Sequence, residues 1–381
     1  MSRPSVTLAD AGRRAEECID FLRALVECES PTGDEEGNLR IAGLLEHAIV
    51  EAGGRVERIR APGFGVHLLG RFRGSARESA PILVMGHMDT VHPVGTLSRL
   101  PFTVGGGKVH GPGVYDMKSG LAVSLFALRL LAERGSGPRD GLTYLVTCDE
   151  EKGSPVSRER IEAEARRHRA ALVMEPSAPG GAVKSRRKGV SAYVLRVEGR
   201  AAHAGIEPEA GANAIHELAR QICRIQEFAD LNVGTTVSIG VIEGGTGSNV
   251  VADAARCTID VRFFSNAEAN RVDASLSAAV PFDERCSLHL EGGLNRGALE
   301  KTDASRLLLE KACSLAAELG LEIGEESTGG ASDGNLIAAT GCPTLDGLGP
   351  DGRGAHTLCE HIFEEEMPRR IALMASLFEA V

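Results

Sequence analysis

Histidine and acidic side chains follow three short apolar runs of this sequence, and another acidic residue lies in a glycine- and proline-rich segment. They are His87 and Asp89 after the run 81–86, Glu150 and Glu151 after 141–147, Glu175 at the end of 170–175, and Asp116 within 111–120. Carboxylates gathered at one place repel one another, so a positive group must neutralise them. Histidine nitrogen and carboxylate oxygen are ligands of zinc and similar first-row metals. The pattern therefore predicts a metal site.

The spacing of these residues indicates which of them could bind the metal and which could orient a ligand or reach a metal-bound water. His87 and Asp89 are two residues apart, so in an extended chain both side chains project to the same side. Asp89 can then hold the ring nitrogen of His87 that does not face the metal. Glu150 and Glu151 are adjacent and point in different directions. One of them can bind metal while the other reaches a metal-bound water, whose pKa a catalytic zinc lowers to about 7.

The elements that would position these residues alternate along the first half of the chain. Apolar residues at helical spacing predict helices over 10–28, 35–53 and 119–135, and the short apolar runs predict strands. Strands separated by helices favour a mostly parallel sheet with helices on both faces. Ligands of such an open α/β sheet bind beyond the carboxyl ends of the strands, which is where the acidic residues lie.

The pattern changes near residue 188. Strands are predicted over 190–199, 235–244, 255–264 and 286–292, and helices over 209–228 and 266–280. This β-α-β-β-α-β order is that of a ferredoxin-like sandwich. Long helices return over 303–320 and 366–380. We therefore expect one α/β domain formed by residues 1–188 and 299–381, interrupted by an inserted α+β sandwich at residues 189–298.

The composition excludes several classes of protein. The 381 residues are 43% hydrophobic and 25% charged, which excludes a disordered chain and fits one large or two moderate domains. The net charge of −11, without a dense basic block, argues against a nucleic-acid-binding face. The sequence shows neither a membrane-spanning apolar window nor a signal peptide. Nine scattered cysteines without a CxxC pair fit reduced thiols, so we expect a cytoplasmic protein that binds neither nucleic acid nor membrane.

Motifs along most of the chain resemble one known family. They are GHMDTV (86–91), GPGVYDMKSG (111–120), CDEEKGS (148–154), MEPS (174–177), GRAAHAG (199–205), GTGSNVV (245–251), DVRF (260–263), TGGASDGN (328–335) and GAHTLCEHI (354–362). In this order they are similar to the co-catalytic zinc exopeptidases. That family includes glutamate carboxypeptidases, aminoacylases, acetylornithine deacetylases and succinyl-diaminopimelate desuccinylases. Within the family, the motif sequences are most similar to those of the folate-hydrolysing glutamate carboxypeptidases.

The resemblance implies a dinuclear metal site. Two zinc ions are expected, and cobalt or manganese are the alternatives. One metal would lie among His87, Asp116 and Glu175, and the other among Asp116, Glu151 and His356, so that Asp116 bridges the two.

The same resemblance assigns roles to residues that do not bind metal. Glu150 would be the general base, and Asp89 would orient His87. Of the two histidines in 354–362, it favours the earlier one as ligand and leaves His361 as a solvated histidine at a helix start. The peptide bond after Asp116 is expected to be cis.

The inserted domain would be a lid and dimerisation domain. His203 would reach the active site of the neighbouring subunit and stabilise the tetrahedral oxyanion. Substrate would be bound by Asn249, by Arg296 or alternatively Arg262 at its C-terminal carboxylate, and by a pocket lined by Gly329, Gly330 and Ser332. Arginine suits a carboxylate because its planar fork can donate two parallel hydrogen bonds.

Three functional hypotheses follow. The first is a two-metal amidohydrolase that releases a C-terminal amino acid, expected to be glutamate, from an N-acyl or peptidyl substrate. The second is a deacylase of small N-acyl amino acids on the same site. The third, of another class, is a non-catalytic binding relative with a decayed site, against which the presence of every expected ligand argues. The expected partners are a small-molecule or short-peptide substrate and a second copy of the chain.

Overall fold

The computed structural model describes residues 5–74, 76 and 78–381, and these form two compact units. The first unit contains the described residues up to Ser185 together with Lys301–Thr328 and Ser332–Val381. The second unit contains Arg186–Glu300 and Gly329–Ala331. Each unit has its own hydrophobic core.

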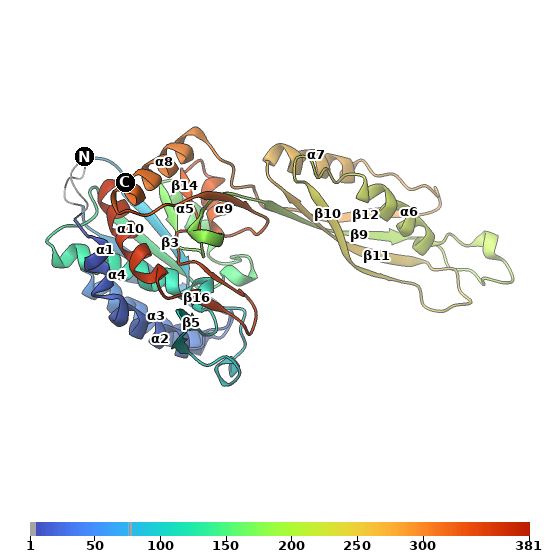
Figure 1. Ribbon diagram of the computed structural model, residues 1–381. Coiled ribbons are helices and arrows are strands. Elements are labelled where there is room, and N and C mark those ends of the chain that lie inside the picture. The colour runs from blue at the N-terminus through green and yellow to red at the C-terminus, as the bar shows by residue number, and fades with distance from the viewer. Residues whose placement is uncertain (1–4, 75, 77) are drawn as a thin grey trace. The chain divides into compact units, whose positions relative to one another are not determined.

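A six-stranded sheet lies at the centre of the first unit (Figure 1). Its strands, in spatial order, are β1 (Arg55–Ala61), β2 (Gly65–Phe72), β6 (Leu142–Thr147), β3 (Ile82–His87), β7 (Ala171–Val173) and β14 (Thr344–Leu345). The pairs β6–β3, β3–β7 and β7–β14 are parallel, whereas β1–β2 and β2–β6 are antiparallel. The predicted mostly parallel sheet is confirmed.

Helices cover both faces of this sheet. One face carries α1 (Leu8–Gly12), α2 (Ala15–Glu27), α3 (Glu35–Glu51), α4 (Ser119–Glu133), α8 (Asp303–Glu318) and α10 (Glu366–Ala380), and the other carries α5 (Arg158–Ala165) and α9 (Asp333–Ala338). Strand β3 shows why both faces need cover, since Val84 packs into the first core and Leu83 and Met85 into the opposite one. The predicted helix 10–28 is divided into α1 and α2, because the first helix ends at Gly12, a poor helix former.

The second unit is an antiparallel sheet with two helices. Its strands, in spatial order, are β10 (Thr236–Gly244), β11 (Ala254–Phe263), β9 (Gly189–Glu198) and β12 (Ser287–Arg296), and its helices are α6 (Ala214–Gln226) and α7 (Asn266–Ser277). The order along the chain is the predicted β-α-β-β-α-β order. Alternate residues of β11, such as Ile259 and Val261, are buried in the core against the helices.

Two smaller sheets complete the structure. One contains β15 (Gly352–Arg353), β16 (His361–Phe363), β5 (Lys108–His110) and β4 (Thr103–Gly105), and the other contains β13 (Glu325–Thr328) and β8 (Val183–Arg187). Short helical turns span Thr96–Ser98, Val114–Lys118, Glu150–Lys152, Pro179–Gly181 and Pro208–Ala210. Among the residues that the structure describes, no helix is both long enough and apolar enough to cross a membrane.

The placement of His361 corrects one expectation. It was expected at a solvated helix start, but it lies in strand β16 and is buried. The strand pairs with β5, where His361 is opposite His110, and the two ring centroids are 5.1 Å apart. A short strand that pairs with a segment more than 250 residues earlier leaves no local signal, so the sequence pattern did not predict it.

Candidate metal centre

The three central strands deliver the acidic residues to one edge of the sheet. Strands β6, β3 and β7 are adjacent and parallel, so their carboxyl ends share that edge. His87 ends β3 opposite Thr147, the last residue of β6. The turn Glu150–Lys152 follows β6, and Glu175 follows β7. The parallel arrangement of the three strands therefore brings His87, Glu175 and the turn Glu150–Lys152 to the same edge.

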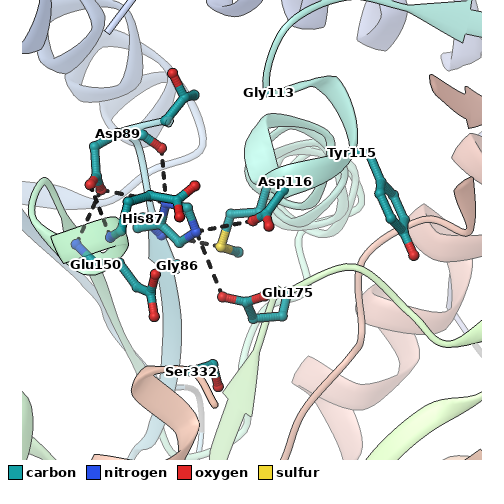
Figure 2. A network of polar contacts seen from close by, with 12 residues as sticks. Gly86, His87, Asp89, Gly113, Tyr115, Asp116, Glu150, Glu175 and Ser332 are labelled. Atoms are coloured by element: carbon teal, nitrogen blue, oxygen red, sulfur yellow. Dashed lines mark hydrogen bonds and ion pairs between the residues drawn. The ribbon is translucent and has the colours of Figure 1, made fainter. Parts of the chain in front are cut away.

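His87 lies between a hydrogen-bonding partner on one side and two carboxylates on the other (Figure 2). Its Nδ1 is 3.0 Å from the main-chain oxygen of Asp89 and 3.4 Å from that residue's carboxylate. Its Nε2 is 3.2 Å from Asp116 Oδ1 and 3.6 Å from Glu175 Oε1. Asp89 therefore directs Nε2 of the imidazole toward the two carboxylates.

Asp116 lies between the two predicted ligand histidines. Its Oδ1 faces His87, while its Oδ2 is 3.3 Å from Nε2 of His356. The same nitrogen of His356 is 3.4 Å from Glu151 Oε2. The structure thus brings together all five predicted ligands, with Asp116 shared between the two sets. The peptide bond between Asp116 and Met117 is cis, as expected.

Burial and mutual charge perturb the protonation of this cluster. Burial opposes the charge of His87, but its hydrogen bonds to Asp116 and Asp89 raise its pKa well above the ordinary value. The hydrogen bond to Asp116 raises the pKa of His356 to about 9. Burial raises the pKa of Glu151 to about 8. Strongly shifted pKa values of this kind are typical of acid–base groups collected at a functional site.

The cluster fits divalent cations. Ligand atoms of His87, Asp116 and Glu151 all lie within 4.8 Å of one another, as do those of His87, Glu150 and Glu175. In addition, Oε1 of Glu151 is buried without a hydrogen-bond partner in the described part of the chain. A buried, unsatisfied carboxylate oxygen is costly, and a cation would satisfy it. Imidazole and carboxylate donors in this combination suit zinc and its neighbours.

The carboxylate of Asp89 also holds the turn that carries the glutamates. It accepts hydrogen bonds from the backbone N–H groups of Glu150 at 3.4 Å and Glu151 at 3.3 Å. The hydroxyl of Thr32 donates to the same carboxylate at 2.7 Å. Asp89 therefore positions both His87 and the turn after β6. Sequence reasoning did not identify Thr32, because it is nearly sixty residues away with no motif of its own.

Another missed residue is Glu360, which is fully buried. Its carboxylate accepts hydrogen bonds from backbone N–H groups of the loop that carries Asp116. Its only signal in the sequence is its position four residues after His356 in the segment 354–362.

The second unit contains most of the predicted substrate contacts. His203 and Asn249 lie together, since His203 pairs with Val250 and the N–H of Ala204 donates to Asn249 O at 2.9 Å. The guanidinium of Arg262 holds the carboxylate of Asp260 at 2.8 Å.

Strand register places Arg262 and Arg296 on the two strands that flank β9. Arg262 of β11 and the buried Arg296 of β12 both pair with Val190 of β9, from opposite sides. Gly330 accepts a hydrogen bond from Arg187 at 3.2 Å, and a Cβ at Gly329 or Gly330 would meet nothing within 4 Å.

Ser332 lies in the first unit and is buried. Its hydroxyl donates to Asp346 at 2.6 Å and caps helix α9 by accepting from the N–H of Gly334 at 3.0 Å. The hydroxyl expected to line the pocket is therefore already engaged in holding the start of this helix.

The fold and the site define a metal-dependent hydrolase with a mixed α/β core. The family model "Peptidase family M20/M25/M40" matches residues 83–380, and the chain belongs to this family. It is accordingly a metallopeptidase or amidohydrolase, which confirms the resemblance read from the motifs.

Similar proteins are found along nearly the whole chain. Carboxypeptidase G2 of Pseudomonas sp. (strain RS-16) is 33% identical over 366 residues, covering 94% of this chain and 88% of that protein. Succinyl-diaminopimelate desuccinylase of Dechloromonas aromatica is 27% identical over 386 residues, covering 95% and 97%. The aminopeptidase PepT structure of Bacillus cereus shares the fold, with a TM-score of 0.82, 24% identity and coverage of 96% and 98%. A structure from Bacillus subtilis described as a dinuclear metal-binding peptidase has a TM-score of 0.70 at 18% identity, covering 96% and 98%.

Proposed function

We propose that this protein is a two-zinc carboxypeptidase that hydrolyses the amide bond before a C-terminal glutamate. The observation that carries the hydrolase part is that two histidines and two further carboxylates lie around a shared Asp116: His87, His356, Glu151 and Glu175. The similarity to a carboxypeptidase at 33% identity supports release of a C-terminal residue. A reducing, cytoplasmic compartment is supported by the nine cysteines, all of which are free.

The residues of the site divide the chemistry among themselves. His87, Asp116 and Glu175 would hold one ion, and Asp116, Glu151 and His356 the other. When bound, the ions would lower the pKa of water in the site and polarise the scissile carbonyl.

Glu150 would act as the general base. Its carboxylate lies beside the ligand cluster, because a carboxylate oxygen of Glu150 is within 4.8 Å of ligand atoms of His87 and Glu175. It takes a proton from the attacking water and delivers it to the nitrogen of the leaving amine. Asp89 keeps this glutamate in place through the backbone N–H that it binds.

The geometry of the second unit supports a division of labour between two subunits. His203 follows the last residue of β9, Glu198, whereas Arg262 and Arg296 pair with Val190 near its start. A strand of this length spans roughly 30 Å at about 3.3 Å per residue. One small substrate cannot touch both ends, so His203 and the arginines of one chain would serve different active sites. This favours a homodimer in which His203 acts on the neighbouring subunit.

We expect His203→Ala to lower turnover roughly 10²–10³-fold with both metals retained, because one oxyanion donor is typically worth about 3–4 kcal/mol. The measurement is kcat at matched metal content. Mixing His203→Ala with Glu150→Gln after joint refolding should restore activity, since about one site in four of a statistical mixture is then intact. A mixture as inactive as its components would show that His203 does not act across a dimer.

Substitution of Arg296 or of Arg262 tests which of the two arginines binds the substrate carboxylate. The Arg262 guanidinium donates to Asp260 through Nε and Nη2. We favour Arg296, the arginine to which the family resemblance assigns this role first. Arg296→Ala should raise KM about 10–100-fold, as loss of a charge-assisted pair costs about 1.5–3 kcal/mol. Arg262→Ala is the matched control, and a larger KM effect there would reverse the assignment.

Parallel assays distinguish glutamate release from the alternative deacylase function. The alternative is favoured by the similarity to the desuccinylases. The purified protein, with metal content measured, is assayed on a folate-like pteroyl-glutamate, N-benzoyl-glutamate, N-acetylornithine and N-succinyl-diaminopimelate. The proposal requires the highest kcat/KM on the two glutamate substrates. A preference for the acetyl or succinyl substrates would establish the deacylase function.

A further inference from the structure

The carboxylate of Glu360 makes four hydrogen bonds although it is fully buried. Its Oε1 accepts from the backbone N–H groups of Tyr115 at 2.9 Å and Asp116 at 3.0 Å. Its Oε2 accepts from the N–H of Gly113 at 3.0 Å and lies 2.6 Å from Nε2 of His92. A buried carboxylate is tolerated only when its oxygens are satisfied in this way.

Three of these bonds come from a stretch of four residues that ends at the shared ligand Asp116. The backbone here is not in a sheet or a regular helix, since Gly113 has φ of +72° and the dihedral angles of Asp116 are non-helical. Its Val114 N–H donates to Gly111 O at 3.2 Å, whereas the N–H groups of Gly113, Tyr115 and Asp116 donate to Glu360, which lies outside the loop. One carboxylate that receives several neighbouring N–H groups fixes the local backbone much as an anion is held in a backbone nest.

The same contacts connect the segments that carry the other ligands. Glu360 lies four residues after His356, and His92 lies five residues after His87. The hydroxyl of Tyr115 donates to the main-chain oxygen of Ser177 at 2.8 Å, two residues after Glu175. Four ligand-bearing segments thus meet at Glu360 and the loop that it holds.

We propose that Glu360 is a positioning residue that sets the separation of Asp116 and His356 and so preforms both metal sites. Asp89 holds the turn that carries Glu151, and Glu360 holds the loop that carries Asp116. This inference rests on the proposed function as a two-metal hydrolase. It assigns to Glu360 no contact with metal or substrate.

The chemistry of an amide at this position makes the proposal testable. The oxygen of Glu360→Gln can still accept from Tyr115 and Asp116, but its NH₂ group then faces the N–H of Gly113. Two donors that face each other leave one buried donor unsatisfied, which forces the loop to move. Loss of a residue that positions metal ligands through hydrogen bonds typically lowers metal affinity about 10–100-fold.

The experiment is a Co²⁺ titration of metal-free protein, followed by visible absorption and by calorimetry. We expect Glu360→Gln to weaken binding at one or both sites about 10–100-fold and to alter the Co²⁺ absorption bands. His92→Ala removes one bond of the four, and we expect a smaller loss of about 3–10-fold. Unchanged affinities, within twofold, and unchanged bands in folded Glu360→Gln would overturn the proposal. If Glu360→Gln does not fold, His92→Ala decides, and affinity within twofold of wild type overturns it.

Asp140→Asn is the matched control. Asp140 is also a buried carboxylate that accepts two backbone N–H bonds, from Glu78 at 2.7 Å and Ser79 at 3.1 Å, and it binds Arg169 at 2.7 Å. It precedes β6 and therefore lies at the opposite edge of the sheet from the ligand cluster. Its substitution should lower stability and leave Co²⁺ binding unchanged. Equal weakening in Asp140→Asn and Glu360→Gln would reduce the effect to general destabilisation and refute positioning.

The wild-type titration separates this inference from the proposed function. Wild-type protein that takes up fewer than two Co²⁺ ions would contradict the dinuclear site itself. Wild-type protein that binds two ions, beside a Glu360→Gln variant that binds them equally well, would contradict only the role of Glu360.

Discussion

Glu150→Gln should retain both metals and lose turnover about 10²–10⁴-fold, the usual contribution of a general base. The amide has almost the same shape as the carboxylate, and the backbone N–H of residue 150 still reaches Asp89, so the turn keeps its place. What disappears is the group that accepts a proton from water. The measurements are kcat and the metal-to-protein ratio of the same sample.

Glu159→Gln is the control for this substitution, because Glu159 lies exposed on α5 a few residues further along the chain. It should leave kcat unchanged. Full activity of metal-loaded Glu150→Gln protein would refute the assignment of the base. Loss of metal together with activity would instead make Glu150 a ligand, which its closeness to His87 and Glu175 makes worth measuring.

Asp116→Ala should release both metals, whereas Glu151→Gln should release one. The reason is geometric, since each oxygen of Asp116 faces a different histidine, while Glu151 belongs to one proposed ligand set, with its Oε2 3.4 Å from Nε2 of His356. Asp116 also lies between His87 and His356, so its removal takes away the carboxylate that separates the two histidines. Metal content by atomic emission after dialysis should fall in the order wild type, Glu151→Gln, Asp116→Ala.

Circular dichroism of the two metal-free variants provides the control for folding. Both should resemble the metal-free wild type, because the substitutions lie at the edge of the sheet and outside its apolar core. Equal metal loss in both variants would contradict the shared role of Asp116. Full occupancy in Glu151→Gln would remove Glu151 from the ligand set.

Much of the candidate site could be predicted because its residues obey a local rule. His87, Glu151 and Glu175 each follow a buried apolar run, and parallel strands bring their carboxyl ends to one edge. The alternation of β11 likewise revealed a sheet with one buried face. Helix spacing and strand length are short-range properties, so the residues themselves carry them.

His356 marks where this local reasoning stops. Only the two-residue strand β15, too short to form an apolar run in the sequence, precedes it; its backbone has φ of +64°, and its side chain is half-exposed. Only the resemblance of the segment 354–362 to the family motif separated it from His361. The reason for the difference is the pairing of β16 with β5, which buries His361 and leaves His356 in the preceding loop.

The sequence by itself determined the types of the candidate ligands, their order along the chain, and the α/β elements that carry most of them. Tertiary structure alone decided the contacts that join distant segments. Glu360 contacts residues 113–116 across almost 250 positions, and Arg262 and Arg296 both pair with Val190, from opposite sides. The physical reason is that these contacts depend on strand register and loop closure. Both are fixed by packing of the whole chain, and no local spacing of residues encodes them.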